Sequence, residues 1–270
     1  MNQKRFANIA LVILMLALAG AFGYFAFVKK SEPAQPPKYP YILKPLSQTQ
    51  LSSLRSEFAT SNKNICTQLN EFGLTEDKSD CGGWVTISIT DEASIIELAK
   101  NWLAQNSEFT GVPKSKVSDI VIDRISSNKK VIGLQISFPV PQLYNGLPVE
   151  GDIAIPKVFA NAKGISRVSG HWFPEITVPL EPKISETSAK NKLNGRTFTY
   201  SDVVGSPRDY RVEQKDLSNV ARKVIFVRKS SQGLEFRLSW KIPVGQELSW
   251  TVYIDAITGE ELKVTQMFVT

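Results

Sequence analysis

The sequence contains few of the residues on which most catalytic and metal sites depend. It has one histidine, His171, and two cysteines, Cys66 and Cys81, in 270 residues. A zinc site needs several ligands drawn largely from these types, and the sequence has no Cys-x-x-Cys and no His-Glu-x-x-His motif. It also lacks the Gly-x-x-x-x-Gly-Lys loop that binds phosphate and the Gly-x-Ser-x-Gly turn of serine hydrolases. We therefore expect no metal, no cofactor and no enzymatic activity.

The single histidine lies in a segment with the apolar character of a strand, between Gly170 and Trp172. A catalytic imidazole needs a nucleophile or a metal, together with a group that orients it. The neighbouring sequence supplies none of these, so we expect a structural or surface role for His171. The alternative is a catalytic pair with Cys66 or Cys81, which a disulfide between the two cysteines would remove.

Charged side chains are absent from Phe6 to Val28. A helix of this length rises about 34 Å, which is enough to cross a hydrocarbon core of about 30 Å. We expect residues 1–30 to form a transmembrane anchor, with residues 6–28 in the bilayer. The alternative is a signal peptide that is cleaved after Ala17-Leu18-Ala19. The apolar run continues well beyond that point, which favours a retained anchor.

The formal net charge of the chain is +6, from 32 Lys and Arg against 26 Asp and Glu. Four of the positive charges precede the first acid, Glu32, so the remainder of the chain carries a net charge of +2. These four are Lys4, Arg5, Lys29 and Lys30. Domains that bind nucleic acid cluster Lys and Arg on one face, and a nearly neutral body is not typical of them. We expect no nucleic-acid partner.

Two cysteines on an exported chain are typical of a disulfide. Pairing of Cys66 with Cys81 would stabilise the fold by roughly 3 kcal/mol on the chain-entropy model. We therefore expect this disulfide, and a single-pass protein of the cell membrane whose C-terminal body is extracytoplasmic. Secretion after signal cleavage is the alternative.

Proline separates the apolar run from the body. Residues 31–46 contain five prolines, which block helices and sheet ladders and favour an extended spacer. Residues 47–84 form a segment that holds the cysteine loop, and the spacing of apolar residues predicts a helix from Ser47 to Phe58. We divide the rest of the body into two modules, 85–178 and 179–270.

The first module reads as a strand, a helix and several antiparallel strands. Val85 to Ile89 alternates apolar and polar residues, as in a strand with one buried face. Thr90-Asp91-Glu92 has the features of a helix start, and apolar residues then recur at helical spacing. Strand pairs are expected at 117–125 and 131–138 across a turn at 126–129, and at 153–159 and 165–173 across a turn at 161–164.

The clearest turn in the first module lies within Gln142 to Glu150. Asn145-Gly146 is the strongest short hairpin signal, because a tight turn needs positive φ at both central positions. A protruding hairpin can dock into a groove, or its strand can add to the edge of a partner's sheet. Tyr144, Asn145 and Gly146 are therefore our candidate partner-binding residues, and a plain turn is the alternative.

The second module repeats the pattern of the first. Ser185 can begin a helix that ends near Leu193 and is followed by Gly195. Trp240 and Trp250 share the alternation of apolar residues in their strands, which predicts core packing. Strand pairs are expected at 221–228 with 234–244 and at 248–255 with 261–269. The predicted fold class is α+β, with two tandem modules that each pack a helix on a curved antiparallel sheet.

Glu92 to Pro174 resembles the propeptide module of thermolysin-like and fungalysin-type secreted metallopeptidases. The family segment Gln-x-Tyr-Asn-Gly-hydrophobic-Pro-Val-x-Gly corresponds to Gln142-Leu143-Tyr144-Asn145-Gly146-Leu147-Pro148-Val149-Glu150-Gly151. Pro182 to Leu262 resembles the PepSY module that follows in such propeptides. That likeness includes the entry Pro182-Lys183-Ile184-Ser185 and the strand and turn from Trp250 to Glu260.

In this family the modules chaperone or inhibit a peptidase. Here no peptidase domain follows Thr270 and no His-Glu-x-x-His occurs, so the expected target is a separate exported protein. The resemblance thus implies a non-enzymatic, membrane-anchored extracytoplasmic module that binds, inhibits or assists the folding of a peptidase or cell-envelope hydrolase. One alternative is a structural or assembly protein of the envelope without an enzyme target, and another is a hydrolase with an unrecognised site.

Overall fold

A computed structural model describes most of the chain after residue 38. The described residues are 39–63, 65–78, 92–117, 126–127, 136–139, 141–151, 153–161, 164–202, 204–246 and 248–268. They belong to one compact unit, Tyr39–Thr270. The predicted transmembrane segment and most of the proline-rich linker lie outside these residues. Within the described residues, no helix is long and apolar enough to cross a membrane.

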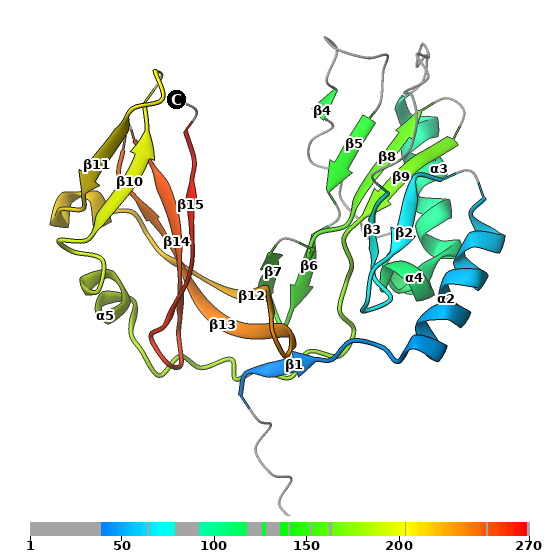
Figure 1. The fold of residues 1–270 in the computed structure, drawn as a ribbon, viewed down its shortest axis with the longest axis horizontal. Helices are drawn as coiled ribbons and strands as arrows, with labels where there is room; N and C mark the ends of the chain where they lie inside the picture. Colours follow the sequence, from blue (N-terminus) through cyan, green and yellow to red (C-terminus); the bar gives the residue numbers. More distant parts are fainter. Residues whose placement is uncertain are drawn as a thin grey trace, which may run out of the picture. The chain divides into compact units, whose positions relative to one another are not determined.

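The fold is mixed α+β, as the sequence predicts, with few helices and a large sheet that is mostly antiparallel (Figure 1). The helices are α2 (Gln48–Ser61), α3 (Glu92–Gln105), α4 (Ser107–Thr110) and α5 (Glu186–Asn191), and two short 3-10 turns are η1 (Lys114–Lys116) and η2 (Gln214–Leu217). The strands before residue 170 are β1 (Tyr41–Leu43), β2 (Thr67–Leu69), β3 (Thr75–Asp77), β4 (Ser126–Ser127), β5 (Ile136–Pro139), β6 (Gln142–Tyr144), β7 (Leu147–Gly151), β8 (Lys157–Asn161) and β9 (Gly164–Ser169). Those after it are β10 (Thr197–Ser201), β11 (Pro207–Arg211), β12 (Arg222–Ser230), β13 (Gly233–Val244), β14 (Trp250–Asp255) and β15 (Glu261–Gln266).

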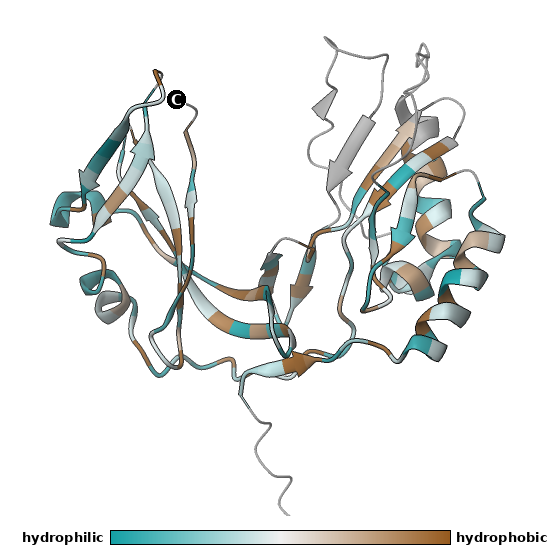
Figure 2. Cartoon of the chain, in the orientation of Figure 1, coloured by the Kyte–Doolittle hydropathy of each residue, from teal (hydrophilic) through white to brown (hydrophobic). Residues whose placement is uncertain are grey.

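The large sheet is built around the long strand β13. Its order is β15-β14-β13-β12-β7-β6, and β1 also pairs with β13. Apolar and polar residues alternate along much of β13, and the hydropathy colouring of the strand in Figure 2 varies accordingly. Because successive side chains of a strand point to opposite faces, the sheet has two unlike faces. One face carries Leu234, Phe236, Leu238, Ile242 and Val244, all of them buried. Leu234 and Phe236 enter an apolar cluster with Phe173 and Val149, and Ile242 and Val244 enter another with α5 and Trp250.

The smaller sheet has the order β4-β5-β8-β9 and is antiparallel. Ala99 and Leu103 of α3 are fully buried in one cluster with Val158 and Ala160 of β8 and Val168 of β9. The predicted arrangement of a helix packed on antiparallel strands is therefore present here. The pairing of β8 with β9 is also confirmed, although β8 begins at Lys157 rather than at 153.

The β6–β7 hairpin lies in the large sheet. The sequence suggested that this hairpin continues the strands of the first module, but β7 pairs in parallel with β12, whose residues come from the second module. Val149 pairs with Ile225, and both side chains are buried in the same cluster. A parallel contact between strands so distant in the chain has no local signal, because it depends on a long connection rather than a turn.

Two helices begin at a serine cap, which was predicted for Ser185 and was not predicted for Ser47. Ser47 and Gln50 form a capping box at the start of α2, and the Ser185 side chain accepts a hydrogen bond from Ser188 N at the start of α5. The helix α5 ends at Asn191 with Lys192 as its C-cap, earlier than predicted, so Gly195 has the expected positive φ of 80° but lies beyond the capping position.

Three local predictions need correction or remain open. Ser126 and Ser127, predicted as part of a turn, form strand β4 instead, because they pair with β5. The hairpin β10–β11 and strand β1 were not predicted. Strand 85–89 and most of 117–125 lie outside the described residues.

Gly111 and Gly146 provide a matched test of how the fold uses glycine. Both have positive φ, 68° and 80°, but a Cβ at Gly111 would lie 1.9 Å from the carbonyl oxygen of Trp172, whereas nothing lies within 4 Å at Gly146. Gly146→Ala should therefore cost only the left-handed strain of about 1–2 kcal/mol. Gly111→Ala should cost more than about 3 kcal/mol. Urea unfolding of both variants measures the difference, and equal losses would contradict this account.

Candidate functional site

The β6–β7 hairpin closes on a tight turn of two residues. Asn145 has φ 48° and Gly146 has φ 80°, and Tyr144 pairs with Leu147 across them. Positive φ at both positions is the geometry that the Asn-Gly pair favours. The predicted hairpin is therefore confirmed, and its tip is exposed at Asn145 and Gly146.

Strand β6 is held by an unusual buried side chain. Gln142 donates a hydrogen bond from Nε2 to the carbonyl oxygen of Phe173 at 2.7 Å, and Phe173 N donates to Gln142 Oε1 at 2.9 Å. The side-chain amide of Gln142 thus bonds to both the N–H and the C=O of Phe173, as the main chain of a neighbouring strand would. Because successive side chains of a strand point to opposite faces, burying Gln142 turns Leu143 outward.

Leu143 is consequently 67% exposed. It pairs with Pro148 of β7, next to the hydrogen-bonded pair that closes the turn. In an antiparallel ladder, the N–H and C=O of such a residue point away from the paired strand. In the described part of the chain β6 is the last strand at this end of the sheet, so a large apolar side chain and an open main-chain edge occur together.

The three predicted partner-binding residues differ in their surroundings. Tyr144 is half-buried and packs against the cluster that contains Phe173 and Val149, so the exposed apolar contact is its neighbour Leu143. The sequence carried no local signal for this, because the alternation in Gln142-Leu143-Tyr144 leaves open which side of the strand is buried. Partner binding at Tyr144, Asn145 and Gly146 stays a prediction.

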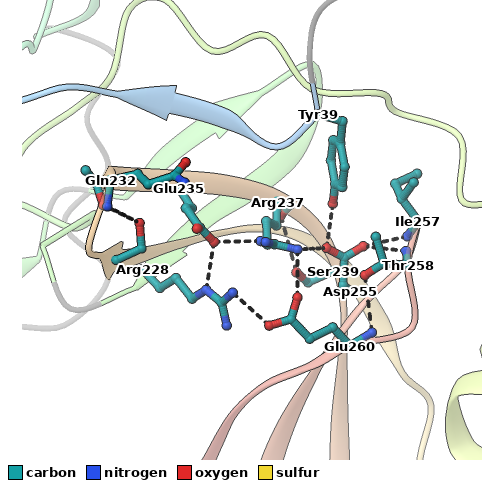
Figure 3. A network of polar contacts seen from close by, with 12 residues as sticks. Tyr39, Arg228, Gln232, Glu235, Arg237, Ser239, Asp255, Ile257, Thr258 and Glu260 are labelled. Carbon is teal, nitrogen blue, oxygen red and sulfur yellow. Dashed lines mark hydrogen bonds and ion pairs between the residues drawn. The ribbon is translucent and has the colours of Figure 1, made fainter.

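The second face of the large sheet carries a network of charged side chains (Figure 3). Arg237 of β13 donates from Nη1 to Asp255 Oδ2 at 2.7 Å and from Nε to Glu235 Oε2 at 2.9 Å. Arg228 of β12 donates from Nε to the same Glu235 oxygen at 2.9 Å and from Nη2 to Glu260 Oε1 at 2.8 Å. Glu260 Oε2 also lies 3.0 Å from Arg237 Nη1, which closes the network.

Burial makes these interactions matter energetically. Asp255 is fully buried, while Arg237 and Glu235 are 7% and 8% exposed. Burial alone would raise the pKa of Glu235, but the hydrogen bonds from Arg228 and Arg237 outweigh it and lower that pKa below its ordinary value. The carboxylate is therefore ionised near neutral pH, and each buried charge has an opposite charge in contact with it.

Asp255 has a further role at the end of β14. Its Oδ1 accepts hydrogen bonds from Ile257 N at 2.7 Å and Thr258 N at 2.9 Å, so one carboxylate fixes the turn to β15. Its Oδ2 accepts from the Tyr39 hydroxyl at 2.9 Å. Burial, and then the Asp255 charge, raise the pKa of Tyr39, which keeps the phenol protonated.

A smaller polar group lies further along the same face. Lys241 Nζ donates to both oxygens of Glu150, at 3.0 and 2.8 Å, and the Tyr253 hydroxyl donates to Glu150 Oε2 at 2.8 Å. The ring of Tyr253 stacks on Phe226 with centroids 4.3 Å apart. Ser239 lies in the strand between them and is fully buried, and its small side chain leaves room for the two rings to meet.

His171 is buried and has a structural environment. Its Nδ1 lies 3.2 Å from the carbonyl oxygen of Phe109, and its ring packs 5.4 Å from that of Phe173. Burial lowers the pKa of His171 from 6.5 to about 4, with the hydrogen bond to Phe109 opposing this shift. The imidazole is therefore neutral at physiological pH. Of the structural and surface roles predicted for His171, these contacts favour the structural one.

The remaining sequence candidates have different outcomes. Trp250 is buried within an aromatic cluster, and half-buried Trp240 packs against the same core while its Nε1 donates to Ile184 O at 2.7 Å, as predicted. Cys81 lies outside the described residues, so its pairing with Cys66 stays a prediction. Among the described side chains, no group of three or more His, Cys, Asp or Glu is arranged to hold a metal ion.

Comparison with known proteins adds little. No protein-family model and no curated protein matches the sequence. Among solved structures, the chain is similar to the Bacillus megaterium YpeB C-terminal domain, with 13% sequence identity and a TM-score of 0.35, over 84% of this chain and 100% of that chain. At this level the likeness establishes neither a shared family nor a function, and the resemblance to propeptide and PepSY modules remains a prediction.

Arg237 can be tested against an exposed arginine. Arg237→Met removes the cation that contacts three carboxylates and should cost about 3–5 kcal/mol, because the fully buried carboxylate of Asp255 loses the cation that it contacts. Arg208→Met removes an ion pair with Asp202 in which the arginine side chain is 61% exposed, and should cost no more than about 1 kcal/mol. Chemical denaturation of the two variants measures both values. A loss at Arg237 as small as that at Arg208 would show that the network contributes little.

His171 should make the fold sensitive to acid. The unfolded chain binds a proton at this residue below about pH 6.5, whereas the folded chain does so only below about pH 4. Stability is therefore complete above pH 6.5 and falls as the pH drops towards 4, by roughly 3 kcal/mol in total. In His171→Gln this part of the pH dependence should disappear. Urea unfolding of both proteins across this range tests it, and parallel curves would exclude His171 as the cause.

Proposed function

We propose that this protein is a non-enzymatic, membrane-anchored extracytoplasmic module that binds an exported peptidase or cell-envelope hydrolase, and inhibits it or assists its folding. In this proposal the body consists of two tandem α+β modules. The β6–β7 hairpin is the surface that contacts the partner. The single observation that carries the proposal is the pairing of an exposed leucine with an open strand edge at Leu143.

Strand addition is a common way to recognise an extended segment of a partner. The main-chain hydrogen bonds supply affinity, and side chains that alternate along the strand supply specificity. A partner strand beside β6 would bond to the main chain of Leu143 and cover its side chain. The Gln142–Phe173 hydrogen bonds hold β6 in place before binding, which reduces the entropy lost on association.

The ionisable groups on the second sheet face support binding rather than catalysis. Arg228, Glu235, Arg237, Asp255 and Glu260 are held by one another. Such groups maintain the shape of the sheet, which in turn positions the hairpin through β12 and β7. The membrane anchor in the proposal rests on the uncharged run at residues 6–28, and the class of partner rests on the resemblance of the sequence to peptidase propeptides.

Leu143 has a suitable control in the same chain. Val220 is 75% exposed but lies in the connection between η2 and β12, outside the strands that the structure describes. Leu143→Asp should lower recovery of the partner by at least about tenfold, the effect of losing 1.4 kcal/mol at a central contact. Val220→Asp should leave recovery unchanged. The measurement is affinity purification of the full chain from solubilised envelope, with quantitative mass spectrometry and an assay of the partner's hydrolytic activity.

The identity of the captured protein decides the outcome. A peptidase or envelope hydrolase that depends on Leu143, and whose activity or folding yield changes when the chain is added, would support the proposal. Equal losses of partner recovery in Leu143→Asp and Val220→Asp would show that the β6–β7 hairpin is not the contact with the partner. Capture of assembly proteins alone would favour the structural alternative instead.

A further inference from the structure

The chain contains two Asn-Gly pairs, Asn145-Gly146 and Asn194-Gly195. Asparagine is prone to lose ammonia in this pair, because glycine has no side chain to obstruct the attack of its main-chain nitrogen on the asparagine amide carbon. Both residues of each pair are exposed. The dipeptide and its access to water are therefore the same at the two places, and a difference in reactivity must come from the fold.

The main-chain nitrogen of Gly146 is available for this reaction. Tyr144 and Leu147 make the pair that closes the β6–β7 hairpin, and the two residues between them take no part in the ladder. Within the part of the chain that the structure describes, no hydrogen bond involves the Gly146 N–H or the Asn145 side-chain amide. Apart from its chain neighbours, no atom lies within 4 Å of the place that a Cβ on Gly146 would take, so water and base reach the turn.

The main-chain nitrogen of Gly195 is held instead. Gly195 N donates to Val212 O at 2.8 Å, and Val212 N donates to Arg196 O at 2.8 Å. These two bonds tie the segment before β10 to the residue that follows β11. An amide must lose its proton before its nitrogen can attack, and a hydrogen-bonded N–H does so only when its segment opens. The fold therefore protects Asn194.

We propose that Asn145 is a modification site, which converts spontaneously to isoaspartate and aspartate while Asn194 stays largely intact. Gly146 N gives up its proton to base and forms a bond to Asn145 Cγ. The side-chain nitrogen takes a proton from solvent and leaves as ammonia, which gives a five-membered succinimide. Water then opens the ring at either carbonyl. One water is consumed and one ammonia is released, and nothing is oxidised or reduced.

The isoaspartate product changes the turn itself. When water attacks the main-chain carbonyl of Asn145, the chain afterwards runs through Cγ and is one carbon longer. A two-residue loop needs positive φ at both central residues, and its length sets the register of the strands. The added carbon therefore opens the Tyr144–Leu147 pair and releases β6 with Leu143. The effect on a partner rests on the function proposed above, whereas the modification itself does not.

The two Asn-Gly pairs serve as matched sites in one experiment. The full chain in detergent micelles is kept at mildly alkaline pH, in buffer and in urea, and peptide mass spectrometry follows the replacement of NH by oxygen at each asparagine. The rate in buffer divided by the rate in urea should be about tenfold higher at Asn145, because tenfold corresponds to 1.4 kcal/mol, about the contribution of one hydrogen bond. Equal ratios, or no conversion of Asn145 in buffer, would overturn the proposal.

Asn145→Asp is the control for the effect on the hairpin. It carries the charge of the modified chain without the extra main-chain carbon. The modified chain is separated by ion exchange, and its isoaspartate is identified by peptide fragmentation. Amide hydrogen exchange in residues 142–151 should be at least about tenfold faster in the isoaspartate form than in Asn145→Asp. Equal exchange would show that the turn absorbs the added carbon, and would overturn the release of β6.

Discussion

The ion pairs of Arg237 are the interactions on which the large sheet depends. Its guanidinium contacts Glu235, Asp255 and Glu260 from the middle of β13, and Arg228 adds a second cation to the same acids. A charge that is almost fully removed from water is tolerated only when opposite charges and hydrogen bonds surround it. That requirement aligns β12, β13 and β14 with one another, and holds the turn after Asp255 in place.

The two edges of interest follow from this central arrangement. β12 carries the parallel strand β7, and β7 carries the hairpin strand β6 with its exposed Leu143. On the other side of β13, the segment from Tyr39 to Leu43 reaches the network through Asp255. One sheet thus exposes an apolar side chain on the outer strand β6, and at β13 its edge is filled by the segment Tyr39 to Leu43 of the same chain.

Local features of the fold were predictable where their causes are local. The Asn145-Gly146 turn follows from the conformations that these two residues tolerate, and the starts of α2 and α5 follow from Ser47 and Ser185 as caps. Alternation identified β13 and β14 as strands, and the turn residues that follow or precede them predicted β12 and β15 as their partners. The exposed position of Leu143 was not predicted, because it depends on Gln142 finding the main chain of Phe173, a residue far along the sequence.

The sequence by itself determined the α+β class, the hairpins with strong turn residues, and the scarcity of residues that bind metals. Their physical basis is the conformational preference of each residue and its nearest neighbours. Only the tertiary structure decided that β7 lies beside β12, that β1 fills the edge of β13, and that Arg237 gathers three acids. Those contacts join segments distant in the chain, and their stability comes from burial and charge pairing, which exist only after the chain has folded.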